Sequence, residues 1–308
     1  MTYATVAWGR GPAIVPLAAS LIDAGICVRE IWYQDPLCAL PKTIHLDLAS
    51  IADRIPLIGE MNSSARVLER LEKLPEVNTI TEVFYTKIIG RQVLERTNVI
   101  NIHPAPLPRY RGAHPLPWQI MRGETKSAVT FHLADSDLDG GPIISQVPFH
   151  IEESDNYSSV LAKVFAIIRA QAGRVFTGFV RGELSAVPQD HTDATYVVKR
   201  APHDGWILWS WSAPEIRNFV RALTAPLPGA WSLWNGQKVI LDQVEIDPRF
   251  SKFVGRTPGQ VASLGRTVAI LTGDSAIVPS RIRESETGRD ITGALHVNDR
   301  FSSPLAAL

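Results

Sequence analysis

The sequence predicts an α/β protein in which a domain with a mainly parallel sheet is followed by a small β-barrel. The parallel sheet is predicted by the order of the first elements. A strand over 3–8, a turn with two glycines, a helix over 14–24 and a strand over 26–33 form a βαβ unit. The barrel is predicted by five short strand patterns between residues 231 and 279, which follow one another too closely for intervening helices.

Length and composition describe an ordinary globular chain. The 308 residues suffice for two domains with their own cores, and 45% of them are hydrophobic. The formal net charge is +0, so no global charge attracts nucleic acid or an acidic membrane. Cys27 and Cys38 give no disulfide framework and favour a reducing compartment. The N-terminus lacks a basic leader and no apolar run approaches a membrane span, so we expect a cytoplasmic protein with no membrane partner.

The turn after the first strand contains Gly9 and Gly11. Two glycines at this place are compatible with cradling a phosphate, which makes Gly9 a candidate for substrate binding. The third glycine of a dinucleotide fingerprint is missing, so a plain turn with close packing of strand and helix is the favoured alternative. The following region, 34–61, contains Pro36, Pro41 and Pro56 and is predicted to be irregular. It has too few Lys and Arg to grip the phosphates of an RNA stem.

The stretch from Asn98 to Gln146 contains the candidate catalytic residues. A buried strand is predicted around 99–102, and Asn101 and His103 lie on one face of it because they are two residues apart. Three prolines follow within five residues, so the chain must leave the sheet there. Open α/β sheets bind their ligands at such strand ends.

Three motifs in this stretch resemble the folate-dependent formyltransferases. They are NIHP over 101–104, LPRYRG over 107–112 and LDGG over 138–141. The most similar subgroup has a formyltransferase domain followed by a small C-terminal domain. It includes methionyl-tRNA formyltransferase and the enzymes that N-formylate amino sugars on nucleotide carriers. The resemblance implies a Rossmann-like catalytic domain over 1–185 and an OB-like barrel domain over 201–308. The segment 186–200 is predicted to be the linker between them, because its sequence is polar and lacks hydrophobic periodicity.

The resemblance also implies an activity, the transfer of a formyl group from 10-formyltetrahydrofolate to a primary amine, with Asn101, His103 and Asp139 as catalytic residues. Such a transfer needs a donor for the developing oxyanion and a group that receives the amine proton. Asn101 offers an amide N–H. His103 either donates to the oxyanion or accepts the proton. Asp139 either orients the imidazole, stabilises its charged form or accepts a proton through water. No metal is expected.

The binding residues are implied in the same way. The expected folate-binding residues are Phe84, Tyr85, Ile88, Leu138 and Gly140. Arg111 is a candidate for contact with the acceptor, and a structural role in which it hydrogen-bonds loop carbonyls is the favoured alternative.

The acceptor is predicted from charge. Residues 201–308 contain nine Arg and two Lys against six Asp and four Glu, whereas a domain that tracks a phosphate backbone has a clear basic surplus. A nucleotide-linked amino sugar is therefore the favoured small-molecule acceptor, and tRNA is disfavoured. Methionyl-tRNA, an amine such as hydroxyornithine, and a non-catalytic folate- or nucleotide-binding module stay as alternatives. The C-terminal domain is then structural or bears a homodimer contact.

Overall fold

The computed structural model describes residues 3–39, 41–52 and 54–302, and the chain divides into two compact units. Within the described residues, the first unit comprises the chain up to Pro115 with Lys126–His150 and Leu161–Val198, and the second comprises Leu116–Thr125, Ile151–Val160 and the chain from Lys199. Two short segments within residues 1–185 thus belong to the second unit, and most of the segment 186–200 belongs to the first.

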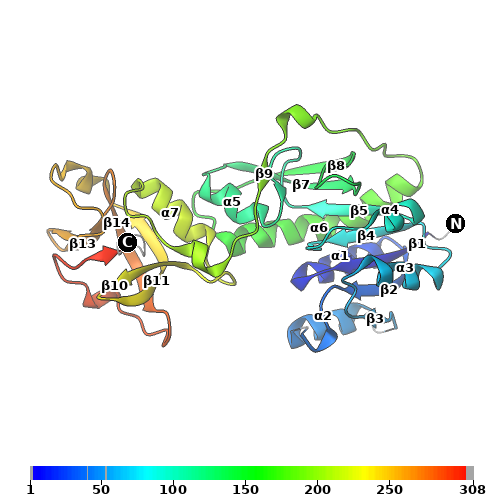
Figure 1. Ribbon diagram of the computed structural model, residues 1–308, viewed down its shortest axis with the longest axis horizontal. Helices are drawn as coiled ribbons and strands as arrows, with labels where there is room; N and C mark the ends of the chain where they lie inside the picture. Colours follow the sequence, from blue (N-terminus) through cyan, green and yellow to red (C-terminus); the bar gives the residue numbers. More distant parts are fainter. Residues whose placement is uncertain (1–2, 40, 53, 303–308) are drawn as a thin grey trace. The chain divides into compact units, whose positions relative to one another are not determined.

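The first unit is built on a mixed sheet, which has seven strands in the described residues and the order β3-β2-β1-β4-β5-β7-β8 (Figure 1). The strands are β1 (Ala4–Gly9), β2 (Cys27–Tyr33), β3 (Leu57–Ile58), β4 (Thr79–Val83), β5 (Asn98–His103), β7 (Lys126–Leu133) and β8 (Ile143–His150). The first five of them pair in parallel, and β7 and β8 are antiparallel. The prediction of a mainly parallel, Rossmann-like sheet is confirmed.

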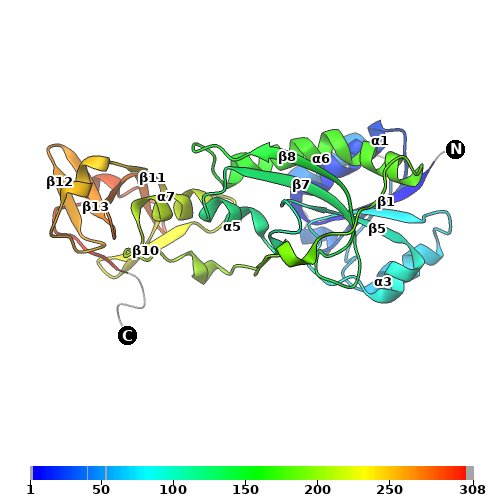
Figure 2. The same cartoon turned by 90° about the horizontal axis from the view of Figure 1, so that it is seen from above.

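Helices cover both faces of this sheet. They are α1 (Ile14–Asp23), α2 (Lys42–Ala52), α3 (Ser64–Glu72), α4 (Arg91–Arg96) and α6 (Tyr157–Val180). Figure 2 shows α1 and α6 on one side of the sheet and α3 on the other. Val67 and Leu71 of α3 pack in one core cluster with Trp8 of β1. None of the described helices has the length and apolar character needed to cross a membrane.

The region 34–61 is more regular than the sequence indicated. It contains the eleven-residue helix α2 and the edge strand β3, which pairs in parallel with β2. The prolines that suggested irregular structure precede these elements instead of interrupting them. Pro41 directly precedes α2, and Pro56 directly precedes β3, positions where a missing backbone N–H is tolerated.

The second unit contains an antiparallel sheet with the order β12-β13-β14-β11-β10-β15 within the described residues. The elements are α5 (Pro115–Met121), α7 (Ala213–Ala222), β10 (Ala230–Trp234), β11 (Gln237–Ile246), β12 (Val261–Leu264), β13 (Thr267–Leu271), β14 (Ala276–Glu284) and β15 (Phe301–Ser302). Asn235 and Gly236 form the two-residue turn between β10 and β11, with φ values of 51° and 78°. Both values are positive, as a type I′ hairpin turn requires.

The two edges of this sheet meet and close it into a barrel. The Phe301 N–H donates to the Gly259 carbonyl at 2.8 Å, and the Val261 N–H donates to the Asp299 carbonyl at 2.9 Å. These bonds join the chain around β15 to the start of β12, at the other end of the strand order. The predicted OB-like barrel is therefore confirmed, and its sheet has no free edge at this junction.

The closing strand allows a test of the barrel. Phe301 is buried and its ring contacts Trp209 at 5.5 Å and Trp234 at 6.4 Å between centroids. We expect Phe301→Ala to destabilise the second unit by about 3–5 kcal/mol, because it removes a large core side chain and leaves a cavity. Denaturant unfolding followed by tryptophan fluorescence measures the loss. Val254→Ala is the control, since Val254 is 99% exposed, and an equal effect of both substitutions would contradict the role of Phe301.

Candidate active site

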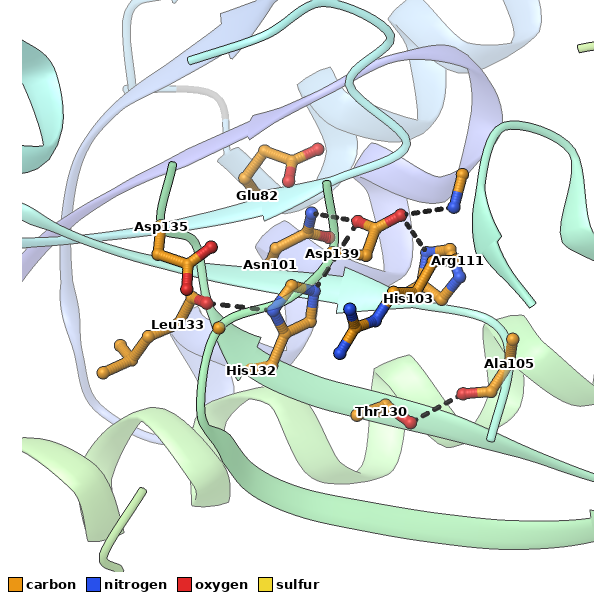
Figure 3. A network of polar contacts seen from close by, with 12 residues as sticks. Glu82, Asn101, His103, Ala105, Arg111, Thr130, His132, Leu133, Asp135 and Asp139 are labelled. Atoms are coloured by element: carbon orange, nitrogen blue, oxygen red, sulfur yellow. Dashed lines mark hydrogen bonds and ion pairs between the residues drawn. The ribbon is translucent and has the colours of Figure 1, made fainter. Parts of the chain in front are cut away.

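A row of polar side chains crosses three neighbouring strands of the first unit. Glu82 of β4 is in register with Asn101 of β5, and Asn101 is in register with His132 of β7. Paired residues on adjacent strands point to the same face, and so does His103, two residues after Asn101. Asp139, from the loop between β7 and β8, faces this row (Figure 3). The row lies at the carboxyl ends of β4 and β5, where α/β sheets bind ligands.

The Asp139 carboxylate is the centre of the cluster. Its Oδ2 accepts the Gly112 backbone N–H at 2.7 Å and lies 3.6 Å from His103 Nδ1. Its Oδ1 accepts from Asn101 Nδ2 at 3.5 Å and lies 3.8 Å from His132 Nε2. The structure therefore brings the three predicted catalytic residues together around one carboxylate.

The geometry assigns the two nitrogens of His103 to different partners. Nε2 lies 2.9 Å from the carbonyl oxygen of Tyr110, which can only accept, so Nε2 carries a proton. Nδ1 therefore is the nitrogen that can exchange a proton, and it faces Asp139. Around the ring, the Thr130 hydroxyl donates to the Ala105 carbonyl at 2.6 Å and holds the turn that follows β5. The imidazole is buried and fixed in one orientation.

His132 is neutral at physiological pH. Its Nδ1 bonds the Leu133 carbonyl at 2.9 Å and so carries the proton. Burial lowers the pKa of His132 to about 4, although the charge of Asp139 opposes this shift. Its Nε2 is buried without a hydrogen-bond partner in the described part of the chain. A lone pair thus faces the Asp139 carboxylate, and a proton donor placed between them would satisfy both.

Glu82 is also neutral at physiological pH. Burial raises the pKa of Glu82 to about 8, and the charge of Asp139 acts in the same direction. A hydrogen bond from the Tyr85 N–H to Glu82 Oε1, at 2.6 Å, opposes the shift and does not reverse it. With Glu82 and His132 uncharged, neither of them competes with Asp139 as the acidic partner of His103.

Two models of one protein family match this chain, and together they cover both units. Residues 60–167 match the model described as formyl transferase, and residues 199–294 match the formyl transferase C-terminal domain. The methionyl-tRNA formyltransferase of Chloroflexus aurantiacus is 34% identical over 194 residues. The bifunctional polymyxin resistance protein ArnA of Wigglesworthia glossinidia brevipalpis is 31% identical over 216 residues. The chain belongs to the formyltransferase family.

The likeness covers these proteins to different extents. The match takes in 62% of this chain and 62% of the Chloroflexus protein, against 69% of this chain and 32% of ArnA. Among solved structures, an N-formyltransferase from Helicobacter canadensis, in complex with folinic acid and dTDP-3-aminofucose, superposes with a TM-score of 0.68. That likeness covers 91% of this chain and 99% of the other at 17% identity, and it shows a common fold.

The residues expected to bind folate lie on two loops, one after β4 and one between β7 and β8. Ile88 is 87% exposed and Leu138 is 56% exposed, so both present apolar side chains to solvent. Tyr85 packs on Trp8 with 4.1 Å between ring centroids, and Phe84 packs on Phe165 at 6.3 Å. Gly140, the fifth of these residues, is buried directly after Asp139, where an added Cβ would lie 2.7 Å from the Cβ of Asp137.

Close packing alone requires glycine at position 9. An added Cβ would lie 2.9 Å from the Val83 carbonyl oxygen, and the Gly9 carbonyl accepts the Gln34 N–H. Arg111 is 1% exposed, and its guanidinium hydrogen-bonds side chains instead of loop carbonyls. Gln189 is the main partner, at 2.7 Å from Nη2, and it comes from the segment predicted to be a linker.

Sequence reasoning missed Glu82, His132 and Gln189. A glutamate within the strand TITEV was a usable signal, because a charged residue in a buried central strand needs an explanation. His132 and Gln189 left no comparable signal, since their roles depend on strand register and on a distant loop. The described residues contain no group of three or more His, Cys, Asp or Glu side chains that could hold a metal ion.

The raised pKa of Glu82 predicts how stability depends on pH. The folded state keeps the Glu82 proton up to about pH 8, whereas the unfolded chain loses it near pH 4.5. Stability is therefore lost as pH rises through this window. Glu82→Gln removes the buried group that ionises, so the stability of the variant does not fall with pH for this reason. We expect the Tm of the variant minus the Tm of the parent chain to increase by about 2–5 °C between pH 7 and 8.5. Scanning calorimetry measures the difference.

The chosen pH range suits Glu82, because His132 is neutral there in the folded state and mostly neutral in the unfolded state. Glu72→Gln serves as the control, since Glu72 is an exposed glutamate in the same unit. A Tm difference for Glu82→Gln that stays constant with pH would show that Glu82 is ionised in the folded protein.

Proposed function

We propose that this chain transfers a formyl group from 10-formyltetrahydrofolate to a primary amine, and that the amine belongs to a nucleotide-linked amino sugar. The observation that carries the proposal is the convergence of Asn101, His103 and Asp139 at the end of β5, with one nitrogen of His103 fixed by a backbone carbonyl. Membership of the formyltransferase family supports the class of reaction.

The chain offers a place for the folate. Leu138 exposes an apolar side chain next to Asp139, and Ile88 exposes another in the loop that follows β4, the strand of Glu82. Apolar groups of this kind suit the flat ring of a pterin. When bound, 10-formyltetrahydrofolate supplies an activated formyl group, so the transfer needs no nucleophilic serine or cysteine.

The catalytic residues divide the work of acyl transfer. Asn101 Nδ2 lies at the long distance of 3.5 Å from Asp139, which leaves its N–H groups able to donate to a developing oxyanion. His103 accepts the proton of the attacking amine on Nδ1, the nitrogen without a backbone partner. Asp139 Oδ2, at 3.6 Å, stabilises the imidazolium that results.

The choice of acceptor rests on charge. The chain has a formal net charge of +0, and the barrel unit lacks the basic surplus that a grip on tRNA needs. The Helicobacter canadensis structure contains an amino sugar on dTDP, and its likeness to this chain covers 99% of the Helicobacter protein. Methionyl-tRNA is the second candidate, favoured by the 34% identity to the Chloroflexus enzyme.

The acceptor is tested by turnover with 10-formyltetrahydrofolate and three separate pools. These are nucleotide-linked amino sugars, charged initiator tRNA and small amino-acid amines, with tetrahydrofolate release and the mass of the formylated product as readouts. Turnover with a sugar nucleotide supports the proposal. Turnover with tRNA alone would assign the second candidate. Folate binding without turnover in any pool would leave a binding module.

The roles of His103 and Asp139 predict large losses of activity. We expect His103→Ala and Asp139→Asn to lower kcat by about 10²–10⁴-fold, because each removes part of the proton-accepting pair. Both variants should still bind tetrahydrofolate and keep the parental unfolding transition. Asp137→Asn is the matched control, an exposed carboxylate of the same loop, and it should retain parental turnover. Near-parental kcat in a folded His103→Ala protein would refute the mechanism.

A further inference from the structure

A single buried side chain interrupts an exposed stretch after α6. Most residues of the segment from the end of α6 to β9 (Tyr196–Val197) are exposed, and Val187, Pro188 and Asp190 are among them. Gln189, between them, is only 7% exposed. Nothing in its neighbourhood along the chain is apolar and buried, so the hydrophobic effect does not account for this burial. Hydrogen bonds must hold the side chain in place.

The amide of Gln189 holds the loop that carries Asp139. Its Nε2 donates to the Asp139 carbonyl at 2.8 Å and to the Gly141 carbonyl at 2.7 Å, so both N–H groups are used. Asp139 has a φ of 49°, which is uncommon for residues other than glycine, although aspartate adopts it more readily than most. The two bonds from Gln189 hold the backbone of this loop in that conformation.

The other end of the same amide is held by Arg111. Gln189 Oε1 accepts from Nη2 at 2.7 Å and from Nε at 3.3 Å. Nη1 of Arg111 reaches the Tyr196 hydroxyl and His191 Nδ1, each at 3.3 Å. A buried guanidinium needs a hydrogen-bond partner for each of its nitrogens, and here three side chains of one segment supply them. Arg111 thus fixes the orientation of Gln189 and closes the chain of bonds.

Backbone contacts tie the same segment to the rest of the site. β9 pairs in parallel with β6 (Arg111–Gly112), and the Gly112 N–H next to it is the donor to Asp139 Oδ2. The Thr195 hydroxyl accepts the Tyr110 N–H at 2.9 Å, and the Tyr110 carbonyl is the partner of His103 Nε2. One segment therefore supports both His103 and Asp139.

We propose that residues 189–197 form a positioning strap, which sets the spacing of His103 and Asp139 through Gln189 and Arg111. The inference rests on the proposed formyl transfer for its kinetic consequences. Gln189 and Arg111 are positioning residues. They act through the loop that carries Asp139 and through the turn whose Tyr110 carbonyl holds His103. A strap of this kind controls kcat, because a displacement of about 1 Å in a catalytic group costs up to 10²-fold in rate.

The substitutions at Gln189 separate positioning from mere stability. Gln189→Glu keeps an acceptor for Arg111, loses both donors and sets a carboxylate against the carbonyls of Asp139 and Gly141. Gln189→Met keeps the length of the side chain and loses every hydrogen bond. Arg111→Lys keeps the charge and loses the paired contact with Gln189. Val187→Ala is the control, since it trims an exposed side chain of the same segment and leaves its backbone bonds to Ile143 intact.

The kinetic test compares kcat with KM at a temperature well below every unfolding transition. We expect Gln189→Glu and Gln189→Met to lower kcat by about 10–100-fold, with KM for 10-formyltetrahydrofolate changed less than about threefold. Arg111→Lys should give a smaller loss of kcat in the same pattern. Val187→Ala should match the parent. Parental kcat in folded Gln189 variants would overturn the proposal, whatever their Tm.

A second measurement does not depend on turnover. Hydrogen–deuterium exchange of the unliganded protein reports the protection of the Gly112 amide and of residues 135–142, which the strap holds. Faster exchange in Gln189→Met at both places, with the rest of the sheet unchanged, supports the strap even if no acceptor is formylated and the proposed function fails. Unchanged exchange at both places would overturn the strap and leave the proposed function untouched.

Discussion

The site depends on a carboxylate held against its own backbone preference. Asp139 adopts a positive φ, and its side chain and its carbonyl are each fixed from a different part of the chain. The Gly112 N–H holds Oδ2, and the Gln189 amide holds the main-chain oxygen. Both donors are uncharged groups, so they fix the position of the carboxylate without neutralising it. The Asp139 carboxylate stays able to face His103, the residue that we propose accepts the amine proton.

Burial simplifies the electrostatics around that anion. Glu82 and His132 carry opposite charges when ionised, yet burial moves the pKa of each toward its neutral form, to about 8 and about 4 respectively. The common cause is desolvation, which disfavours charge of either sign. At neutral pH Glu82 and His132 therefore act as uncharged polar groups beside Asp139 and His103. The row on β4, β5 and β7 supplies polarity without competing charges.

Local sequence patterns were enough to predict the elements that create the site. The βαβ opening, the strand that ends at His103 and the Asn235-Gly236 turn all follow from spacing and turn chemistry within a few residues. The row of Glu82, Asn101 and His132 could not be predicted in this way. It exists because of the register between three strands, and no short pattern records register. The prediction of irregular structure over 34–61 was wrong, because a proline disrupts a helix or strand only inside it. Pro41 and Pro56 stand directly before α2 and β3, where proline is tolerated.

The strap shows why polar, aperiodic sequence was hard to interpret. The segment 186–200 lacks the hydrophobic periodicity that marks buried structure, and by that measure it was a linker. Its task requires amide and hydroxyl groups, because its partners are carbonyls, an N–H and a guanidinium. Gln189 also links Arg111 to the main-chain carbonyl of Asp139. An ion pair between Arg111 and Asp139 would engage the carboxylate oxygens that face His103. The Gln189 amide instead fixes the backbone of Asp139 and makes no bond to its carboxylate.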